Sequence, residues 1–158
     1  MAQNKTLTAS PDLATGVAQF LTPVVRDLIA LSVNAKQAHW HLRGVNFVSL
    51  HEFLDTVTDH AREAYDTAAE RVVALGLPID ARLTTVAQKA TNPVPAEGFQ
   101  QYEQIVADML EQFDATLGSV REAVKELDEI DPVSQDIAIA IQQQLEQDRW
   151  FLYAHIGS

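Results

Sequence analysis

The amino-acid sequence predicts an all-α protein, a bundle of four long helices in a single domain. Apolar residues recur at steps of three and four along almost the whole chain, which is the spacing of one helix face. Alternation of β-branched and polar residues, the pattern of a strand, persists nowhere. The length suits one domain, residues 1–158, and an apolar content of 47% is enough for a sizeable core.

The first predicted helix carries a long apolar series and ends near Gly44, where a glycine commonly stops a helix. Two dipeptides, Ser10-Pro11 and Thr22-Pro23, have the form of an N-cap followed by a first-turn proline. Either dipeptide can start the helix, and Pro23 can also kink a helix that starts earlier. Residues 1–10 are expected to form a flexible N-terminal tail. The apolar series is Val17, Phe20, Leu21, Val24, Leu28, Leu31, Ala35, Ala38 and Leu42.

A second helix is predicted from about Ser49 to Leu75, because Gly76 and Pro78 follow it. The next stretch, residues 77–98, contains three of the six prolines and one short helical candidate, residues 83–90. This connection is therefore too long and too rich in proline to be a tight turn.

Two more long helices complete the predicted bundle. The third follows an apolar series from Tyr102 to Leu127. The fourth opens with Asp131-Pro132, again an N-cap and a first-turn proline, and its apolar series continues to Ile156. Because the longest connection lies between the second and third helices, we predict an up-down bundle with one crossover.

The chain is acidic, with 22 Asp and Glu residues against 11 Lys and Arg residues and a formal charge of −11. Nearly all of the excess lies after residue 96, where 13 acidic residues face 3 basic ones. Such a charge repels phosphate backbones and attracts cations. The sequence has no Cys, which excludes disulfides and thiolate metal sites. It shows no secretory leader pattern and no unbroken apolar run of membrane-spanning length, so we expect a cytoplasmic protein without a membrane partner.

Polar residues that interrupt the helical pattern gather between His39 and Glu70. On the second predicted helix, His51 and Asp55 are four residues apart, as are Asp66 and Glu70. At about 100° per residue, these four side chains share one face of the helix. Imidazole and carboxylate together suit an ion such as iron, zinc or manganese. This face is therefore a candidate metal-binding surface.

The distance between the two pairs requires a second subunit. Their midpoints are 15 residues apart, or about 22 Å along a helix, so a single ion cannot reach both pairs of one chain. An antiparallel second copy would place His51 and Asp55 beside Asp66 and Glu70 of the partner subunit, which gives two identical sites per dimer. His39, near the end of the first helix, is a candidate for a fifth ligand.

At these residues the sequence closely resembles the Dps-like miniferritins of the ferritin superfamily. The resemblance is carried by residues 36–55, KQAHWHLRGVNFVSLHEFLD, by residues 66–71, DTAAER, and by Leu75-Gly76. It covers the first two helices residue by residue and the rest of the chain by helix order and length. It implies a ferritin-like four-helix bundle with a short extra helix in the connection between helices 2 and 3.

The resemblance also implies a function. Dps-like proteins are dodecameric shells that oxidise Fe(II) with hydrogen peroxide, or with dioxygen, and store the Fe(III) mineral inside, which protects against oxidative stress. Carried over to this sequence, the iron ligands are His39, His51 and Asp55 of one subunit with Asp66 and Glu70 of the partner subunit. Trp40 matches the tryptophan beside the centre, where it is a candidate for electron transfer.

The family also admits iron through pores lined by acids near the start of the last helix. By position, the candidates here are Asp131 and Asp136, with Asp128 and Glu129 as funnel residues. A ring of carboxylates concentrates cations. Asp131 has a competing role as the N-cap of the last helix.

Two other functions compete with iron storage. Many Dps relatives compact DNA through basic tails, but the first 20 residues contain Lys5 as their one base and the last 20 contain Arg149. We therefore expect DNA binding to be weak or absent at neutral pH. The second alternative is metal-assisted hydrolysis of an amide or ester at the same inter-subunit centre, since a bound metal can generate hydroxide.

Several neighbouring polar residues are assigned structural or surface roles. His60 lies about 180° from His51 and therefore on the opposite helix face. The string His51-Glu52-Phe53-Leu54-Asp55 departs from the zinc-peptidase pattern His-Glu-x-x-His in its last residue. The residues expected outside the ligand set are His41, Glu52, His60 and His155. Asp59 and Glu63 are either additional ligands or residues that pair with Arg62 or solvent, and we favour the second interpretation.

Overall fold

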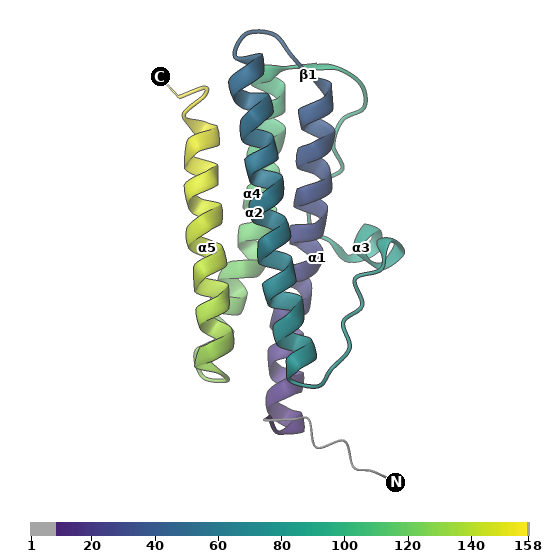
Figure 1. Ribbon diagram of the computed structural model, residues 1–158, viewed down its shortest axis with the longest axis vertical. Coiled ribbons are helices and arrows are strands. Elements are labelled where there is room, and N and C mark those ends of the chain that lie inside the picture. Colours follow the sequence, from purple (N-terminus) through teal and green to yellow (C-terminus); the bar gives the residue numbers. More distant parts are fainter. Residues whose placement is uncertain (1–8, 158) are drawn as a thin grey trace.

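Four long helices lie side by side along one axis and form a bundle, as the sequence predicts (Figure 1). The computed structural model describes residues 9–157, so most of the expected N-terminal tail, residues 1–8, lies outside the described residues. The elements are α1 (Pro11–His41), β1 (Leu42–Arg43), α2 (Phe47–Ala74), α3 (Leu83–Lys89), β2 (Gln100–Gln101), α4 (Tyr102–Leu127) and α5 (Pro132–Tyr153).

The predicted crossover is present. A short turn joins α1 to α2, which runs back antiparallel to it, and the connection after α2 then returns along the length of the bundle (Figure 1). As a result α4 runs in the same direction as α2, and α5 runs back beside it. The short helix α3 lies in this connection and packs against α1. The bundle therefore holds the end of α1 and the start of α2 together at one end.

The start of α1 is decided by Ser10 and not by Thr22. The Ser10 side chain accepts a hydrogen bond from the backbone N–H of Leu13, and Pro11 occupies the first turn. Pro23 lies inside the helix. Residues of α1 on both sides of Pro23, among them Leu21 and Val24, are fully buried. Burial of this face therefore keeps the helix continuous through a residue that usually ends one.

The helix α1 is also apolar enough, by length and composition, to cross a membrane, with a mean hydropathy of 1.3 over 18 residues. This finding does not contradict the absence of an unbroken apolar run of that length, because a mean hydropathy tolerates polar residues that interrupt the run. Of that window, 44% is buried inside the bundle, and Val17, Leu21 and Leu28 are fully enclosed. The apolar face of α1 thus forms part of the core of this domain.

A short parallel pairing departs from the all-α prediction. Leu42 of β1 pairs with Gln100 of β2, and Arg43 with Gln101, which ties the α1–α2 turn to the start of α4. Two residues are too few for a strand period to be visible in the sequence. Gly44 follows with a φ of 109°, and a Cβ there would lie 2.7 Å from Oε1 of Gln101. The backbone conformation favours glycine at this position, whereas the Gln101 side chain could move away from a Cβ.

Candidate metal centre

His39 and His51 form a stacked pair where α1 ends and α2 begins. Their ring centroids are 3.6 Å apart and their planes are inclined by 16°. Each ring Nδ1 lies against the backbone carbonyl of the other residue, at 2.8 Å for His39 and 2.9 Å for His51. The carbonyl of His39 lies in the last turn of α1, where helix carbonyls lack an intrahelical partner. The His51 ring therefore caps α1 while it is itself held in place.

These two hydrogen bonds decide how each ring can bind a ligand. A carbonyl oxygen accepts only, so each Nδ1 carries the hydrogen and donates it. The proton on Nδ1 leaves a lone pair on Nε2 of each neutral ring. Hydrogen bonds of this kind fix the tautomer and orientation of histidines that bind metals. Both predicted histidines thus have a nitrogen free for a metal ion.

Asp55, the third predicted ligand, lies beside this pair. Its Oδ1 is 3.5 Å from Nδ1 of His39 and accepts a hydrogen bond from the Lys36 ammonium group. The Lys36 hydrogen bond lowers the pKa of Asp55; partial desolvation opposes this effect, and the positive charge of Lys36 adds to it. Asp55 is therefore held as a carboxylate with a cation already next to it.

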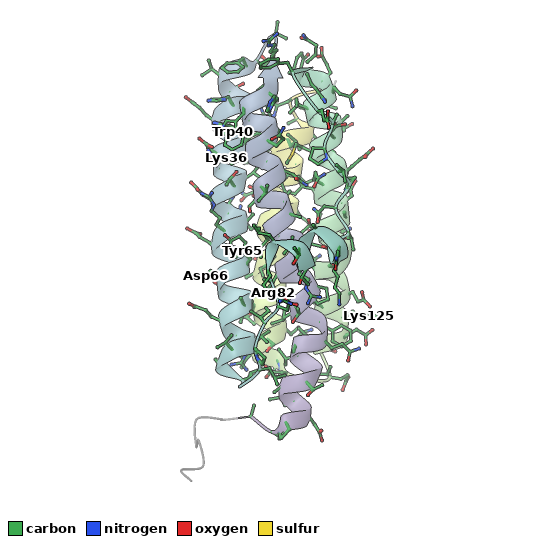
Figure 2. All side chains as sticks on the ribbon, turned by 90° about the vertical axis from the view of Figure 1, so that its right-hand side faces the viewer. Lys36, Trp40, Tyr65, Asp66, Arg82 and Lys125 are labelled. Atoms are coloured by element: carbon green, nitrogen blue, oxygen red, sulfur yellow. The ribbon has the colours of Figure 1, made fainter. Side chains whose placement is uncertain are left out.

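Lys36 is a residue of this site to which sequence reasoning assigned no role. It lies three residues before His39, so the two side chains share one face of α1. That spacing is a signal that could have identified it. Trp40 is 63% exposed and lies at the same end of the bundle as Lys36 (Figure 2). Phe47 stacks on His51 with centroids 4.9 Å apart, which covers the other face of that ring.

Asp66 and Glu70 lie on α2 well away from the histidines. Asp66 is farther down the bundle than Lys36 and Trp40 (Figure 2), and both carboxylates are exposed. Among residues 9–157, neither forms a hydrogen bond or an ion pair. No group of three His, Asp or Glu side chains in this part of the chain is placed to hold a metal ion. One chain therefore brings His39, His51 and Asp55 together but not Asp66 and Glu70.

The four pore candidates have different environments. Asp131 is buried, accepts a hydrogen bond from the backbone N–H of Ser134 at 3.1 Å as the N-cap of α5, and pairs with Arg71 at 2.8 Å. Burial raises the pKa of Asp131, but the hydrogen bonds from Ser134 and Arg71 outweigh it and lower the pKa overall. Asp131 therefore serves as the N-cap of α5, the role that competes with lining a pore. Asp128, Glu129 and Asp136 are exposed.

Four of the neighbouring polar residues, His41, Asp59, His60 and His155, have partners elsewhere. His41 bonds to the Gln37 carbonyl at 2.9 Å, and His155 to the Phe151 carbonyl at 2.8 Å. Asp59 lies 3.9 Å from Arg62 in an exposed pair. His60 pairs with Asp148 of α5 across the bundle, on the opposite side of α2 from His51.

Comparisons with known proteins agree with this architecture. The sequence matches the ferritin-like domain family over residues 19–158. It is 33% identical over 138 residues to the DNA protection during starvation protein of Agrobacterium fabrum, a match that covers 86% of this chain and 85% of that protein.

Two solved structures extend the comparison to the fold. A Dps from Microbacterium arborescens in its high iron form has a TM-score of 0.92 and 51% identity, over 96% of this chain and 99% of that one. A Dps from Mycobacterium smegmatis has a TM-score of 0.92 and 26% identity, over 100% of this chain and 90% of that one. The protein with the stacked His39–His51 pair therefore belongs to the ferritin-like family, as a Dps-like miniferritin.

Proposed function

We propose that this protein is a ferroxidase and iron store that oxidises Fe(II) with hydrogen peroxide, or with dioxygen, at centres shared between two subunits. Membership of the family supports iron storage and protection from oxidative damage. The proposal of Fe(II) oxidation at a shared centre rests on the pair of histidines, His39 and His51. Hydrogen bonds at Nδ1 leave the Nε2 atom of each ring free. Two such nitrogens beside a carboxylate form half of an iron site.

The second half comes from another copy of the chain. Asp66 and Glu70 are exposed carboxylates that form no hydrogen bond or ion pair within the described part of their own chain. A two-fold axis near His60 and Ala61 brings them opposite His51 and Asp55 of the partner, so each dimer has two equal sites. Three carboxylates and two imidazoles then bind Fe(II), and the carboxylates neutralise its charge.

Each residue has a distinct part in the oxidation. His39 and His51 orient the iron through Nε2, and Asp55 exchanges its Lys36 partner for the metal. Peroxide accepts one electron from each of two Fe(II) ions, its O–O bond breaks, and two protons convert its oxygens to two water molecules. No hydroxyl radical is released, because both electrons are delivered to one peroxide. The exposed indole of Trp40 stands beside the site as an electron donor when the second iron is absent.

The proposal includes a dodecameric shell in the cytoplasm. Asp128, Glu129 and Asp136 remain the exposed acids near the start of α5 for a cation entrance. Protection in this account comes from removing iron and peroxide, not from coating DNA, because the chain has a formal charge of −11 and Lys5 is the one base in its first 20 residues. Weak or absent DNA binding is thus part of the proposal.

Subunit mixing tests the shared centre directly. One variant, Asp66→Ala with Glu70→Ala, keeps the histidine half; the other, His51→Ala with Asp55→Ala, keeps the carboxylate half. Each is expected to lose peroxide-driven Fe(II) oxidation when assembled alone. Co-refolding equal amounts makes about half of the dimers mixed, and each mixed dimer has one complete site. We therefore expect about a quarter of the wild-type rate.

The control is the same mixture assembled separately and combined afterwards, with subunit mass and shell mass measured in parallel. Rates that stay at background after co-refolding, while the shells assemble normally, would contradict a centre shared between subunits. Substantial activity in either variant alone would contradict the assigned ligands.

A further inference from the structure

A second histidine–carboxylate arrangement lies on the opposite side of α2 from the candidate iron centre. His60 of α2 and Asp148 of α5 are joined by a contact of 2.8 Å between Nδ1 and Oδ2. The Asp148 side chain is 3% exposed, whereas that of His60 is 29% exposed. A buried acid is thus paired with a histidine that reaches the surface.

The hydrogen-bond partners of Asp148 orient the His60 ring. Oδ1 of Asp148 accepts a hydrogen bond from Nε2 of Gln144 at 3.1 Å, and Oδ2 faces His60. A carboxylate oxygen accepts, so Nδ1 of His60 donates the hydrogen in this contact. This leaves the lone pair of Nε2 directed away from Asp148. The same order of carboxylate, histidine and free nitrogen supports metal ligands in many proteins.

A groove lies in front of this ring. Its volume is about 290 Å³ and its walls come from α2 and α5. Glu63, one helical turn after His60, and Asp136 of α5 both line it, and its lining contains no Lys or Arg. Neither Glu63 nor Asp136 forms an ion pair within residues 9–157. The groove therefore combines a nitrogen donor with negative charge that has no counter-ion.

We propose that His60 Nε2 and Glu63 hold one divalent transition-metal ion in this groove, with water molecules in its other coordination positions. Imidazole and carboxylate donors favour zinc, iron or manganese over calcium or magnesium. The protein ligands number two, because the described residues bring no three His, Asp or Glu side chains together. Asp136 contributes by charge across the groove. Asp148 is a positioning residue, since it acts through the His60 ring.

Zinc is the probe for this site because it has no redox chemistry of its own. The experiment counts Zn²⁺ bound per chain by competition with a chromophoric chelator, using assembled protein that carries Asp55→Ala, Asp66→Ala and Glu70→Ala. On this background, His60→Gln is compared with His155→Gln, a histidine outside the groove. We expect one fewer Zn²⁺ per chain with His60→Gln than with His155→Gln. Equal numbers would overturn the proposal.

Two further measurements separate binding from folding and from ferroxidase chemistry. The glutamine amide in His60→Gln can still donate to Asp148, so we expect the helical content measured by circular dichroism to be unchanged. On the same background, Asp148→Asn is expected to weaken Zn²⁺ binding about 10- to 100-fold, and unchanged affinity would contradict the positioning role.

In otherwise wild-type protein, His60→Gln should leave the initial rate of Fe(II) oxidation unchanged. A rate reduced to that of Asp66→Ala would show that the groove is not a separate site.

Discussion

The two parts of α2 that carry the proposed iron ligands are built in opposite ways. At its start, His51 stacks on His39, bonds to the end of α1 and is covered by Phe47, while Asp55 is held by Lys36. In its second half, Asp66 and Glu70 extend into solvent without a hydrogen bond or ion pair to the described residues. One part is organised within a single chain, and in the proposed function the other part depends on a partner subunit.

This difference follows from the chemistry of the ligands. An imidazole binds a metal through one lone pair in the ring plane, so its tautomer and ring orientation must be fixed beforehand. A carboxylate offers two oxygens with several lone pairs and tolerates adjustment on binding. We infer that the α1–α2 hairpin prepares the nitrogen ligands, and that assembly supplies the remaining carboxylates. Oxidation is then confined to assembled subunits.

The largest expected effect distinguishes the two parts by activity and stability together. His51→Ala and the pair Asp66→Ala with Glu70→Ala should each lower the Fe(II) oxidation rate about 100-fold or more, since even loss of an outer-shell partner costs about 10- to 100-fold. Only His51→Ala should also destabilise the protein, by about 1–2 kcal/mol, because it removes a stacked ring and a hydrogen bond to α1. Stopped-flow oxidation and denaturant unfolding measure the two effects.

For the exposed carboxylates, the expected change in unfolding free energy is within about 0.5 kcal/mol. Equal destabilisation by both sets of substitutions would show that the second half of α2 is organised in the single chain after all.

The next largest effect is on stability and concerns the far end of α2. There Arg71 forms an ion pair with Asp131, unlike the nearby Asp66 and Glu70, which form none within residues 9–157. Asp131→Asn should reduce the unfolding free energy by about 2–3 kcal/mol, because it breaks a mostly buried ion pair and changes the N-cap of α5. This loss is smaller than that for a fully buried pair because Arg71 is 22% exposed. The matched control is Glu129→Gln, which changes an exposed acid three residues from Pro132. This substitution should change the unfolding free energy by less than about 0.5 kcal/mol.

The pH dependence gives a second test of the same pair. The pKa of Asp131 is lower in the folded chain than in the unfolded one, so its stabilising contribution is complete above the unfolded value of about 4. It is lost as the pH falls through the folded pKa. Asp131→Asn should therefore remove part of the acid-induced loss of stability between neutral and acidic pH. A slope identical to that of the wild type would contradict the ion pair with Arg71.

The smallest effect concerns Lys36. Lys36→Met should tighten Zn²⁺ binding at the shared centre about two- to fivefold, since it removes a cation that competes for Asp55, and a pair this exposed contributes about 0.2–1 kcal/mol. Chelator competition on assembled protein measures the change, and Lys125→Met, an exposed lysine on α4, is the control. Weaker binding in Lys36→Met would mean that Lys36 holds Asp55 in its binding position.

Much of the fold could be predicted because its signals are local. The N-cap and proline pairs place the starts of α1 and α5, and the apolar series of α4 runs over the same residues as the helix, 102–127. Local signals could not decide whether α1 starts at Ser10 or at Thr22, because the answer depends on burial of both halves of α1. The pairing of Leu42–Arg43 with Gln100–Gln101 could not be predicted from the sequence either, because it joins segments far apart in the chain.

The candidate site divides in the same way. Residue type and spacing were enough to select His39, His51, Asp55, Asp66 and Glu70, and to show that one ion cannot reach both pairs on α2. They also placed His60 on the other face of the helix. They could not identify Asp148 as its partner, because 88 residues separate the two in sequence.

The sequence by itself therefore determined the helix pattern and which candidate ligands share one face of α2, since both depend on periodicity along one chain. From the same periodicity it predicted a second subunit. Only the tertiary structure decided which nitrogen of each histidine is free, that Lys36 neutralises Asp55 and that Asp131 is bound to Arg71. These properties depend on hydrogen-bond partners from other helices. A partner becomes defined only when packing of the core brings those helices to a fixed distance.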